Sequence, residues 1–316
     1  MVRGCVLLCV ARLSESGQRE PDSESRATRR RILLRGWVFL IVMLSASPAV
    51  AQQPLRFKWQ QGQTLTYSVQ QTTSVAETTL EDGTNKPVTG ATVTKLALTR
   101  KWEVKAVDAN GTATLEMAIT AFRQQINRPG PLDKDGKFTI NSTVIDSATP
   151  EGQQQTAAFL NKPIVTVKLD AQGRLLEAKA ASGSTDRLHA ELPFRLVLPD
   201  QAPAMGGVWE RAFTIKLDPP QGTGEKHEAT QTYTLKGEAQ GVTTVSVATA
   251  LKAPPKDPAE LPPLIPMLWE GEVYFHKETG RYVGARLVVK KEIANHQGEG
   301  TKFVYESTYS EDAIEK

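Results

Sequence analysis

Histidine is the residue type in this sequence best suited to bind a transition metal or to move a proton near neutral pH. The chain has four histidines, His189, His227, His276 and His296. Metal binding needs several imidazoles or carboxylates that converge, and the helical pattern His-Glu-x-x-His would announce such a site. None of the four histidines lies in that pattern. The sequence therefore predicts no metal site and no cofactor.

Loops that contain serine and glycine are the next candidates for chemistry. A nucleophilic serine requires Gly-x-Ser-x-Gly between a strand and a helix, and residues 182–185 lack that frame. A phosphate-binding loop has four residues between its glycines, whereas residues 130–137 have five and are followed by Phe138. The same stretch also fails as a calcium loop, because Pro131 and Ser142 stand where carboxylates belong. No catalytic residue is predicted.

Paired carboxylates could still hydrolyse a sugar, but their separation is a property of the fold and not of the sequence. The chain after residue 51 holds 31 acidic residues, and nothing distinguishes one pair among them. A hydrolase with scattered catalytic groups therefore stays open as the least favoured function.

The segment at 27–51 has the layout of a secretory signal peptide. Arg29, Arg30, Arg31 and Arg35 form a cationic head, an apolar core follows, and Ala-Val-Ala at 49–51 supplies a cleavage site. The apolar core is much shorter than the roughly 20 residues that span a bilayer. We expect cleavage near Ala51, so that the mature protein is periplasmic or secreted and keeps no stable transmembrane anchor.

Removal of residues 1–51 changes the charge of the chain. The leader holds eight arginines and four acidic residues, so residues 52–316 carry 30 basic and 31 acidic residues. Binding of nucleic acid needs clustered Lys and Arg, which this nearly neutral body lacks, so nucleic acid is not expected as a partner. Both cysteines, Cys5 and Cys9, also lie in the leader. The mature protein therefore has no disulfide, although its compartment would permit one.

The body alternates apolar and polar residues with a period of two, which predicts half-buried strands. Asn110-Gly111 separates two long strands and predicts a tight hairpin turn, for which both residues would supply positive φ angles. Short helices are expected at 153–160 and 185–192. The Pro/Gly-rich stretch at 127–137 and the proline-rich stretch at 253–266 are expected to be inserts between the strands, and the second is expected to adopt extended polyproline-II structure. Strands are expected at 65–69, 93–107, 112–122, 164–169, 174–178, 209–217, 230–236, 243–251, 272–276, 281–290 and 301–309.

A faint internal repeat runs through these strands. Residues 54–181 and 203–309 share the order of Trp-containing strands, a central glycine turn and a closing Gly-Arg turn at Gly173 and Gly280. The sequence predicts one β-rich domain at 52–316, and a division of that domain into two repeats stays open.

The stretch from Leu55 to Tyr67, the turn at Asp108–Gly111 and the Gly-Arg turns resemble an uncharacterised family of secreted β-rich bacterial proteins, a domain family of unknown function. This resemblance implies topology and compartment and no chemistry. The layout is also similar to that of periplasmic lipoprotein carriers, whose open, strongly curved antiparallel sheet holds acyl chains. Fold alone does not fix function.

The sequence therefore predicts an all-β fold, a strongly curved antiparallel sheet or open barrel-like sheet with one or two short helices. We expect six large aromatic residues to be mostly buried, namely Trp59, Trp102, Phe122, Trp209, Trp269 and Tyr282. A ligand cavity inside such a sheet would be lined by apolar side chains. The segment at 192–198 would close it, and the candidate lining residues are Val104, Met117, Ile119, Val167, Phe194, Leu235 and Val247.

Three function classes follow from these observations. The first is a non-catalytic extracytoplasmic binding or envelope-associated protein whose ligand is unknown. The second is a carrier of an apolar ligand or lipid, and the third is the hydrolase described above. The candidate partners are an apolar ligand or an envelope component. A core filled by the same apolar residues is the competing interpretation of the candidate lining.

Overall fold

The computed structural model describes residues 54–315, apart from 82, 84, 135–137 and 220. The predicted leader and signal peptide lie outside the described residues. Within them the chain forms one antiparallel sheet of 12 strands and two short α-helices. No helix in this part of the chain is long and apolar enough to cross a membrane.

The first three strands are the longest of the sheet, and β1, β2 and β3 have 17, 21 and 20 residues. The strands are β1 (Thr64–Leu80), β2 (Pro87–Val107), β3 (Ala113–Leu132), β4 (Phe138–Asp146), β5 (Pro163–Leu169), β6 (Leu175–Ala180), β7 (Val208–Leu217), β8 (Glu225–Ala239), β9 (Val242–Leu251), β10 (Glu270–His276), β11 (Arg281–Ala294) and β12 (Lys302–Ala313). The helices are α1 (Pro150–Thr156) and α2 (Asp186–Glu191), with 3₁₀ turns η1 (Pro258–Glu260) and η2 (Ile265–Met267).

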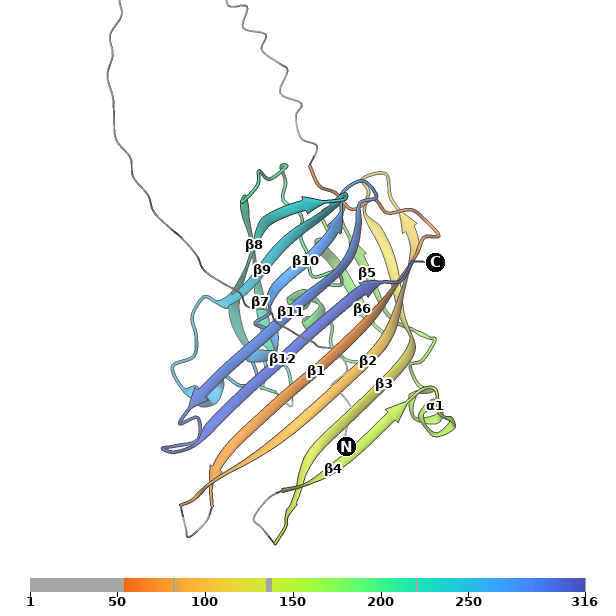
Figure 1. The fold of residues 1–316 in the computed structure, drawn as a ribbon. Coiled ribbons are helices and arrows are strands. Elements are labelled where there is room, and N and C mark those ends of the chain that lie inside the picture. Colours follow the sequence, from red (N-terminus) through yellow and green to blue (C-terminus); the bar gives the residue numbers. More distant parts are fainter. Residues whose placement is uncertain (1–53, 82, 84, 135–137, 220, 316) are drawn as a thin grey trace, which may run out of the picture. The chain divides into compact units, whose positions relative to one another are not determined.

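The strand order is β6-β5-β3-β2-β1-β12-β11-β10-β9-β8-β7, and β4 pairs with β3 beside this path (Figure 1). Strands of the first half of the chain thus lie on one side, strands of the second half lie on the other, and β1 pairs with β12 between them. No pairing in the described residues joins β6 to β7, so the sheet is open. The internal repeat stays a prediction.

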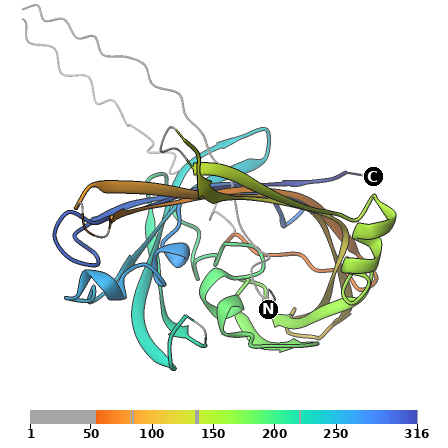
Figure 2. The ribbon, with the colours of Figure 1, turned by 90° about the horizontal axis from the view of Figure 1, so that it is seen from below.

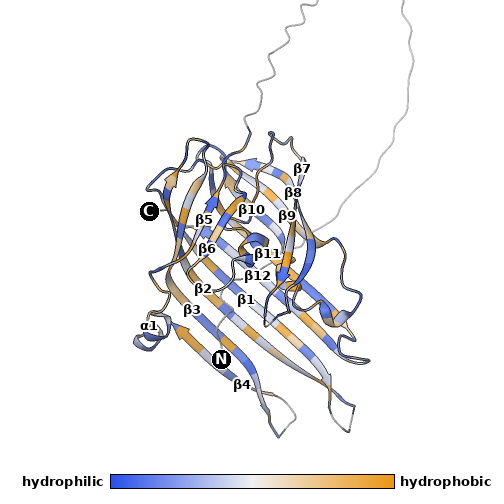
Figure 3. Ribbon diagram, turned by 180° about the vertical axis from the view of Figure 1, so that it is seen from behind, coloured by the Kyte–Doolittle hydropathy of each residue, from blue (hydrophilic) through white to orange (hydrophobic). Residues whose placement is uncertain are grey.

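The sheet is strongly curved, and one of its faces is concave (Figure 2). Register shifts at Thr99/Arg100, Val104/Ala106 and Tyr274/Phe275 mark β-bulges, which bend a strand and increase its twist. Apolar and polar residues alternate in bands along the strands (Figure 3), so the concave side, here called the inner face, receives the apolar set. The expected all-β, open and curved architecture is confirmed.

All of the strands expected from alternation are present. The hairpin turn between β2 and β3 forms at Asp108, whose carboxylate accepts hydrogen bonds from the backbone N–H groups of Asn110 and Thr112. Gly111 has a φ of 80°, a left-handed value that glycine adopts without a steric cost. Asn110 itself does not need a positive φ, in contrast to the expected turn geometry.

The structure differs from the expectation at the two inserts. Strand β3 continues through 127–132, and β4 (Phe138–Asp146) pairs with it although no strand was expected there. The proline-rich stretch at 253–266 forms 3₁₀ turns at Pro258–Glu260 and Ile265–Met267 instead of the expected extended polyproline-II structure. The expected helices are shifted toward the N-terminus at α1 and nearly correct at α2.

The core lies on the inner face and joins both halves of the sheet. Of the six aromatic residues expected to be buried, Trp102, Phe122, Trp269 and Tyr282 are buried. Trp59 and Trp209 are half-buried and pack against the same cluster. Their indole N–H groups donate to the backbone carbonyls of Asp170 and Val197. These two rings therefore sit at the border of the core, where a polar partner is within reach.

Candidate functional site: the inner face of the sheet

The candidate lining residues other than Phe194 come from both halves of the sheet and share its inner face, whereas Phe194 lies in the segment between α2 and β7. Val104 in β2 lies opposite Leu115, which in turn lies opposite Val167 in β5. Val247 in β9 lies opposite Gly271 in β10. All of the candidates except the half-buried Leu235 belong to the main core cluster, namely Val104, Met117, Ile119, Val167, Phe194 and Val247. The structure therefore brings this set together in one apolar surface that other side chains cover.

Residues 192–198, here called the strap, cover this surface. The strap follows α2 and runs inside the curve of the sheet (Figure 2). Its apolar side chains belong to the main core cluster: Leu192, Phe194, Leu196, Val197 and Leu198. The C-terminal end of the strap is held by paired hydrogen bonds, because Leu198 N donates to Gln172 O at 2.8 Å and Gln172 Nε2 donates to Leu198 O at 3.1 Å.

Phe194 is the central side chain of the strap and is 2% exposed. Its ring centroid lies 5.4–6.0 Å from five other aromatic rings, which belong to the N-terminal segment, β1, β2 and β11. These distances are typical of tilted and edge-on aromatic pairs, which add to the free energy of burial. The five rings are those of Phe57, Trp59, Tyr67, Trp102 and Tyr282.

The backbone of the strap is strained at two positions. Leu192 has a φ of 55° and Arg195 has a φ of 56°, and both are left-handed values for residues with a large side chain. Each such residue costs about 1–3 kcal/mol and persists only where its surroundings impose the conformation. The contacts of the strap with the inner face must therefore outweigh a local tendency of the strap to rearrange.

A buried ion pair fastens the strap to the sheet. Arg100 in β2 pairs with Glu311 in β12, and both side chains are buried. Arg100 Nη2 also donates to the carbonyl of Pro193 in the strap at 3.1 Å. The second oxygen of Glu311 accepts hydrogen bonds from the hydroxyls of Tyr282 at 2.7 Å and Tyr309 at 2.6 Å. Both charges are thus paired and hydrogen-bonded, as buried charges require.

Burial and charge act in opposite directions on this pair. Burial acts to lower the pKa of Arg100, but the negative charge of Glu311 outweighs it and raises this pKa above its ordinary value. Burial raises the pKa values of Tyr282 and Tyr309, and the charge of Glu311 raises them further. Arg100 therefore stays charged and the tyrosines stay neutral hydrogen-bond donors at any physiological pH.

A second buried arginine lies within the strap. Arg195 Nη2 lies 3.0 Å from Glu191 Oε2 at the end of α2, and its guanidinium lies 4.8 Å from the ring centroid of Tyr309. Arg195 Nε has no hydrogen-bond acceptor among the described residues, and neither do the buried indole N–H groups of Trp102 and Trp269. These three groups can only donate. The inner face therefore offers donors to any ligand that carries acceptor atoms.

Arg211 in β7 anchors α2 beside the strap. Its guanidinium donates to the carbonyls of His189 and Ala190 and to Gln231 Oε1. Burial lowers the pKa of Arg211. Carbonyl groups at the end of a helix attract a cation, so Arg211 ties the N-terminal end of the strap to the sheet.

The four histidines do not form a site. His189 lies on α2, His227 on β8 and His276 on β10, and His296 Nε2 lies 3.0 Å from Glu77 Oε1 near the turn after β11. In the described part of the chain, no group of three or more His, Cys, Asp and Glu residues could hold a metal ion.

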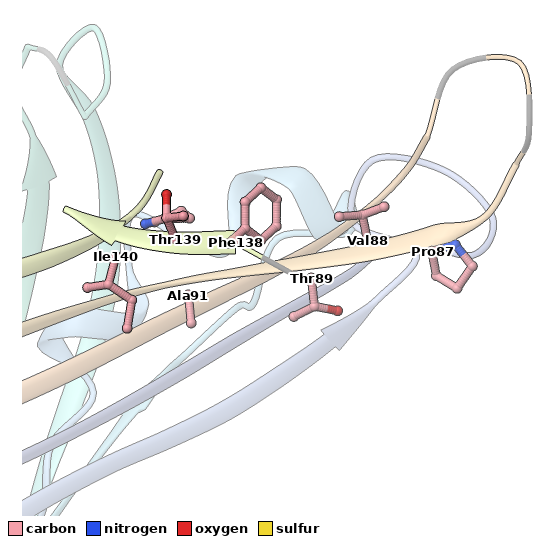
Figure 4. Close-up of a pocket in the computed structure, with 8 residues that line it drawn as sticks. Pro87, Val88, Thr89, Ala91, Phe138, Thr139 and Ile140 are labelled. Carbon is pink, nitrogen blue, oxygen red and sulfur yellow. The ribbon is translucent and has the colours of Figure 1, made fainter. Parts of the chain in front are cut away.

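Two surface hollows lie away from the strap. One has a volume of about 460 Å³ and lies where β2, β3 and β4 meet. Figure 4 shows that Phe138 and Val88 extend from one side of these strands, whereas Ile140 and Ala91 extend from the other. The second, of about 230 Å³, lies beside Met117 and charged residues such as Lys101. Neither hollow opens under the strap.

The polar residues of the inner face were not predicted from the sequence, although a signal was present. Arg100 shares the phase of the apolar residues Leu98 and Trp102, and Glu311 shares the phase of Tyr309. A charged residue in the apolar phase of a strand predicts a buried partner, because an unpaired buried charge is very costly. Sequence alone could thus have identified Arg100 and Glu311 as buried, but not as partners.

The buried tyrosines predict a loss of stability at alkaline pH. Burial raises the pKa of Tyr233 from 10.0 to about 12. Its contribution is therefore fully present below pH 10 and is lost between pH 10 and about 12. Each such proton changes the free energy of unfolding by about 1.4 kcal/mol per pH unit. The tyrosines with raised pKa values on the inner face are Tyr67, Tyr233, Tyr282 and Tyr309.

Absorbance at the tyrosinate band measures this effect. We expect these four tyrosines to ionise only when the protein unfolds, in a steep step with a matching loss of β-sheet circular dichroism. Gradual ionisation of all six tyrosines near pH 10 without unfolding would contradict the burial of this face.

No protein-family model and no curated protein matches this sequence. Among solved structures, the chain is similar to one described as lipid–protein interactions in lipovitellin. The match has 13% sequence identity and a TM-score of 0.41. It covers 82% of this chain and 26% of the other, so this chain spans about a quarter of that protein's length.

Proposed function

We propose that this protein is a non-catalytic, extracytoplasmic carrier that binds an apolar ligand, such as an acyl chain, on the inner face of its sheet in place of the strap. The observation that carries this proposal is the nature of the cover. The candidate lining on the sheet is covered by one short segment that is not a β-strand. The side chains of Leu192, Phe194 and Leu196 in this segment give the sheet an apolar surface, as an acyl chain would.

The energetics of the strap support an exchange with a ligand. Two strained residues, Leu192 and Arg195, favour its release, while burial of its apolar side chains favours the closed state at about 25 cal/mol per Å². A ligand of similar apolar area would replace the burial energy that the strap loses on release. Release would also relieve the backbone strain at Leu192 and Arg195. The indole N–H groups of Trp102 and Trp269 would remain on the sheet and could donate to ester or carboxylate oxygens of the ligand.

The extracytoplasmic location is part of the proposal. It depends on the predicted signal peptide at 27–51, which lies outside the described residues. The resemblance to a family of secreted bacterial proteins is also part of the proposal, and it depends on the stretch from Leu55 to Tyr67 and on the turns that follow it. An envelope-associated binding role without a ligand on the inner face is the competing function.

A disulfide that locks the strap tests the proposal. Gln172 and Leu198 are joined by a backbone hydrogen bond of 2.8 Å, and the chain after the leader has no cysteine of its own. The double variant Gln172→Cys/Leu198→Cys is delipidated and titrated with a fluorescent fatty acid. We expect the reduced form to bind the probe, and the oxidised form to bind it at least about tenfold more weakly, since a locked closed state removes the competent conformation.

A matched control carries the disulfide elsewhere. Thr78 and Thr89 face each other across β1 and β2, with hydroxyls 2.7 Å apart, far along the strands from the strap. Oxidation of Thr78→Cys/Thr89→Cys is expected to leave binding unchanged. No binding by the reduced strap variant, or equal binding by its two redox forms, would overturn the carrier function.

A further inference from the structure

The edge of β4 is a free edge of the sheet. Among the described residues, β4 pairs with β3 and with no other strand (Figure 1). The N–H and C=O groups on the other side of an edge strand can pair with a strand from another chain. Proteins usually prevent such pairing with charged residues, proline or a bulge on the edge.

Strand β4 lacks charged residues and proline along 138–145, whereas β6 and β7, the edge strands at the two ends of the described sheet, carry charged residues. Strand β6 carries Glu177 and Lys179, and β7 carries Glu210 and Lys216. The edge of β4 is therefore the one at which addition of a strand meets the least opposition.

The exposed side chains of β4 are arranged symmetrically. Ile140 is 72% exposed and Val144 is 48% exposed, and each lies two residues from Ser142 on the same face. If a second copy of β4 pairs in antiparallel orientation about an axis at Ser142, Ile140 of each copy lies opposite Val144 of the other. Cross-strand pairs of β-branched residues stabilise a sheet by about 0.2–1 kcal/mol each.

We propose that the edge of β4 is the interface of a homodimer, in which two copies pair through residues 139–145 and continue the sheet from one chain to the other. In a twofold-symmetric dimer the same patch of both copies forms the interface, so the patch must be complementary to itself. Strand β4 meets this condition, because its exposed Ile140 would lie opposite Val144 of the second copy. Its neutral composition offers no counter-charge to a charged partner strand. The pairing ends at Ile145, because Gly152 of α1 packs against the backbone of Asp146.

A cysteine at the axis tests this geometry directly. In the proposed dimer Ser142 lies opposite Ser142 of the second copy, so Ser142→Cys is expected to form an intermolecular disulfide on mild oxidation. The matched control is Leu176→Cys, which places a thiol on a residue that is 56% exposed on the β6 edge. We expect rapid cross-linking of the first variant and little of the second.

Sedimentation of the wild type and of a charged variant completes the test. The wild type is expected to dimerise with a dissociation constant of about 10 µM, as suits a small interface. Ile140→Lys/Val144→Lys is expected to weaken the dimer at least tenfold and to leave the unfolding midpoint of the monomer unchanged. The control Leu176→Lys is expected to dimerise as the wild type does.

Three results would overturn the proposal. The first is a monomeric wild type at about 100 µM, ten times the expected dissociation constant. The second is a dimer that survives the two lysines on β4. The third is a failure of Ser142→Cys to form a disulfide between two copies of this chain. Pairing of β4 with an unrelated protein in place of a second copy would count as such a failure. None of these results bears on ligand binding under the strap, so this inference and the carrier function fail independently.

Discussion

Replacement of Phe194 with alanine is expected to lower the free energy of unfolding by about 3–5 kcal/mol, the range for large-to-small changes of a buried phenylalanine. Its ring is 2% exposed and contacts five aromatic rings, so its loss leaves a cavity that the curved sheet cannot close. Urea unfolding followed by tryptophan fluorescence measures the change, with the slope m as a check that the transition stays two-state.

The same variant links stability to the proposed function. If Phe194 holds the strap closed, its truncation raises the fraction of molecules whose inner face is free, and apparent affinity for a ligand rises by the same factor. If Phe194→Ala destabilises the closed state by about 3 kcal/mol relative to the state with a free inner face, the apparent binding of the fluorescent fatty acid becomes about a hundredfold tighter. A destabilised variant with unchanged affinity would show that the strap belongs to a permanent core.

Phe159→Ala is the matched control for this prediction. Phe159 is half-buried and its ring contacts Phe122 at 5.4 Å, outside the strap. Its truncation is expected to cost less than half as much as that of Phe194, since less apolar area is buried, and to leave binding unchanged. A loss below about 1 kcal/mol for Phe194→Ala would contradict the packing of the strap, because truncation of a buried phenylalanine typically costs about 3–5 kcal/mol.

The strands that bury one face were predictable from the sequence, and β4 was not. A strand such as β2 alternates Leu96, Leu98, Trp102 and Val104 because one of its faces is dry. Strand β4 has hardly any buried face, so nothing selects apolar residues at every second position. The prolines and glycines before it are tolerated because β3 forms a bulge between Pro129 and Leu132.

The parts of the inner face that depend on long-range register could not be predicted. Arg100 and Glu311 are 211 residues apart, and they meet only because β1 pairs with both β2 and β12 in the observed register. Periodicity reports which face of one strand is buried and says nothing about its partner. The candidate lining was placed on one face for the same local reason, whereas the close fit of Phe194 against it follows from tertiary packing.

Removal of one member of the Arg100–Glu311 pair is the second change with a large expected effect. Arg100→Met leaves Glu311 as a buried carboxylate held by tyrosine hydroxyls alone, and it also frees the Pro193 carbonyl of the strap. Loss of one partner from a buried ion pair costs about 3–5 kcal/mol. Urea unfolding at pH 7 measures this loss, and we expect Glu311→Leu to cost a similar amount.

The double variant Arg100→Met/Glu311→Leu completes a double-mutant cycle, which measures the interaction energy between Arg100 and Glu311. Replacement of both charges by apolar residues removes their desolvation cost, so the double variant is expected to be at least about 2 kcal/mol more stable than either single variant. The exposed pair Lys290–Glu306 is the control, and its loss is expected to cost less than about 1 kcal/mol. Additive losses in the Arg100–Glu311 cycle would contradict a coupled buried pair. A stable double variant that binds the fatty acid more tightly would show instead that the pair serves to hold the strap through Pro193.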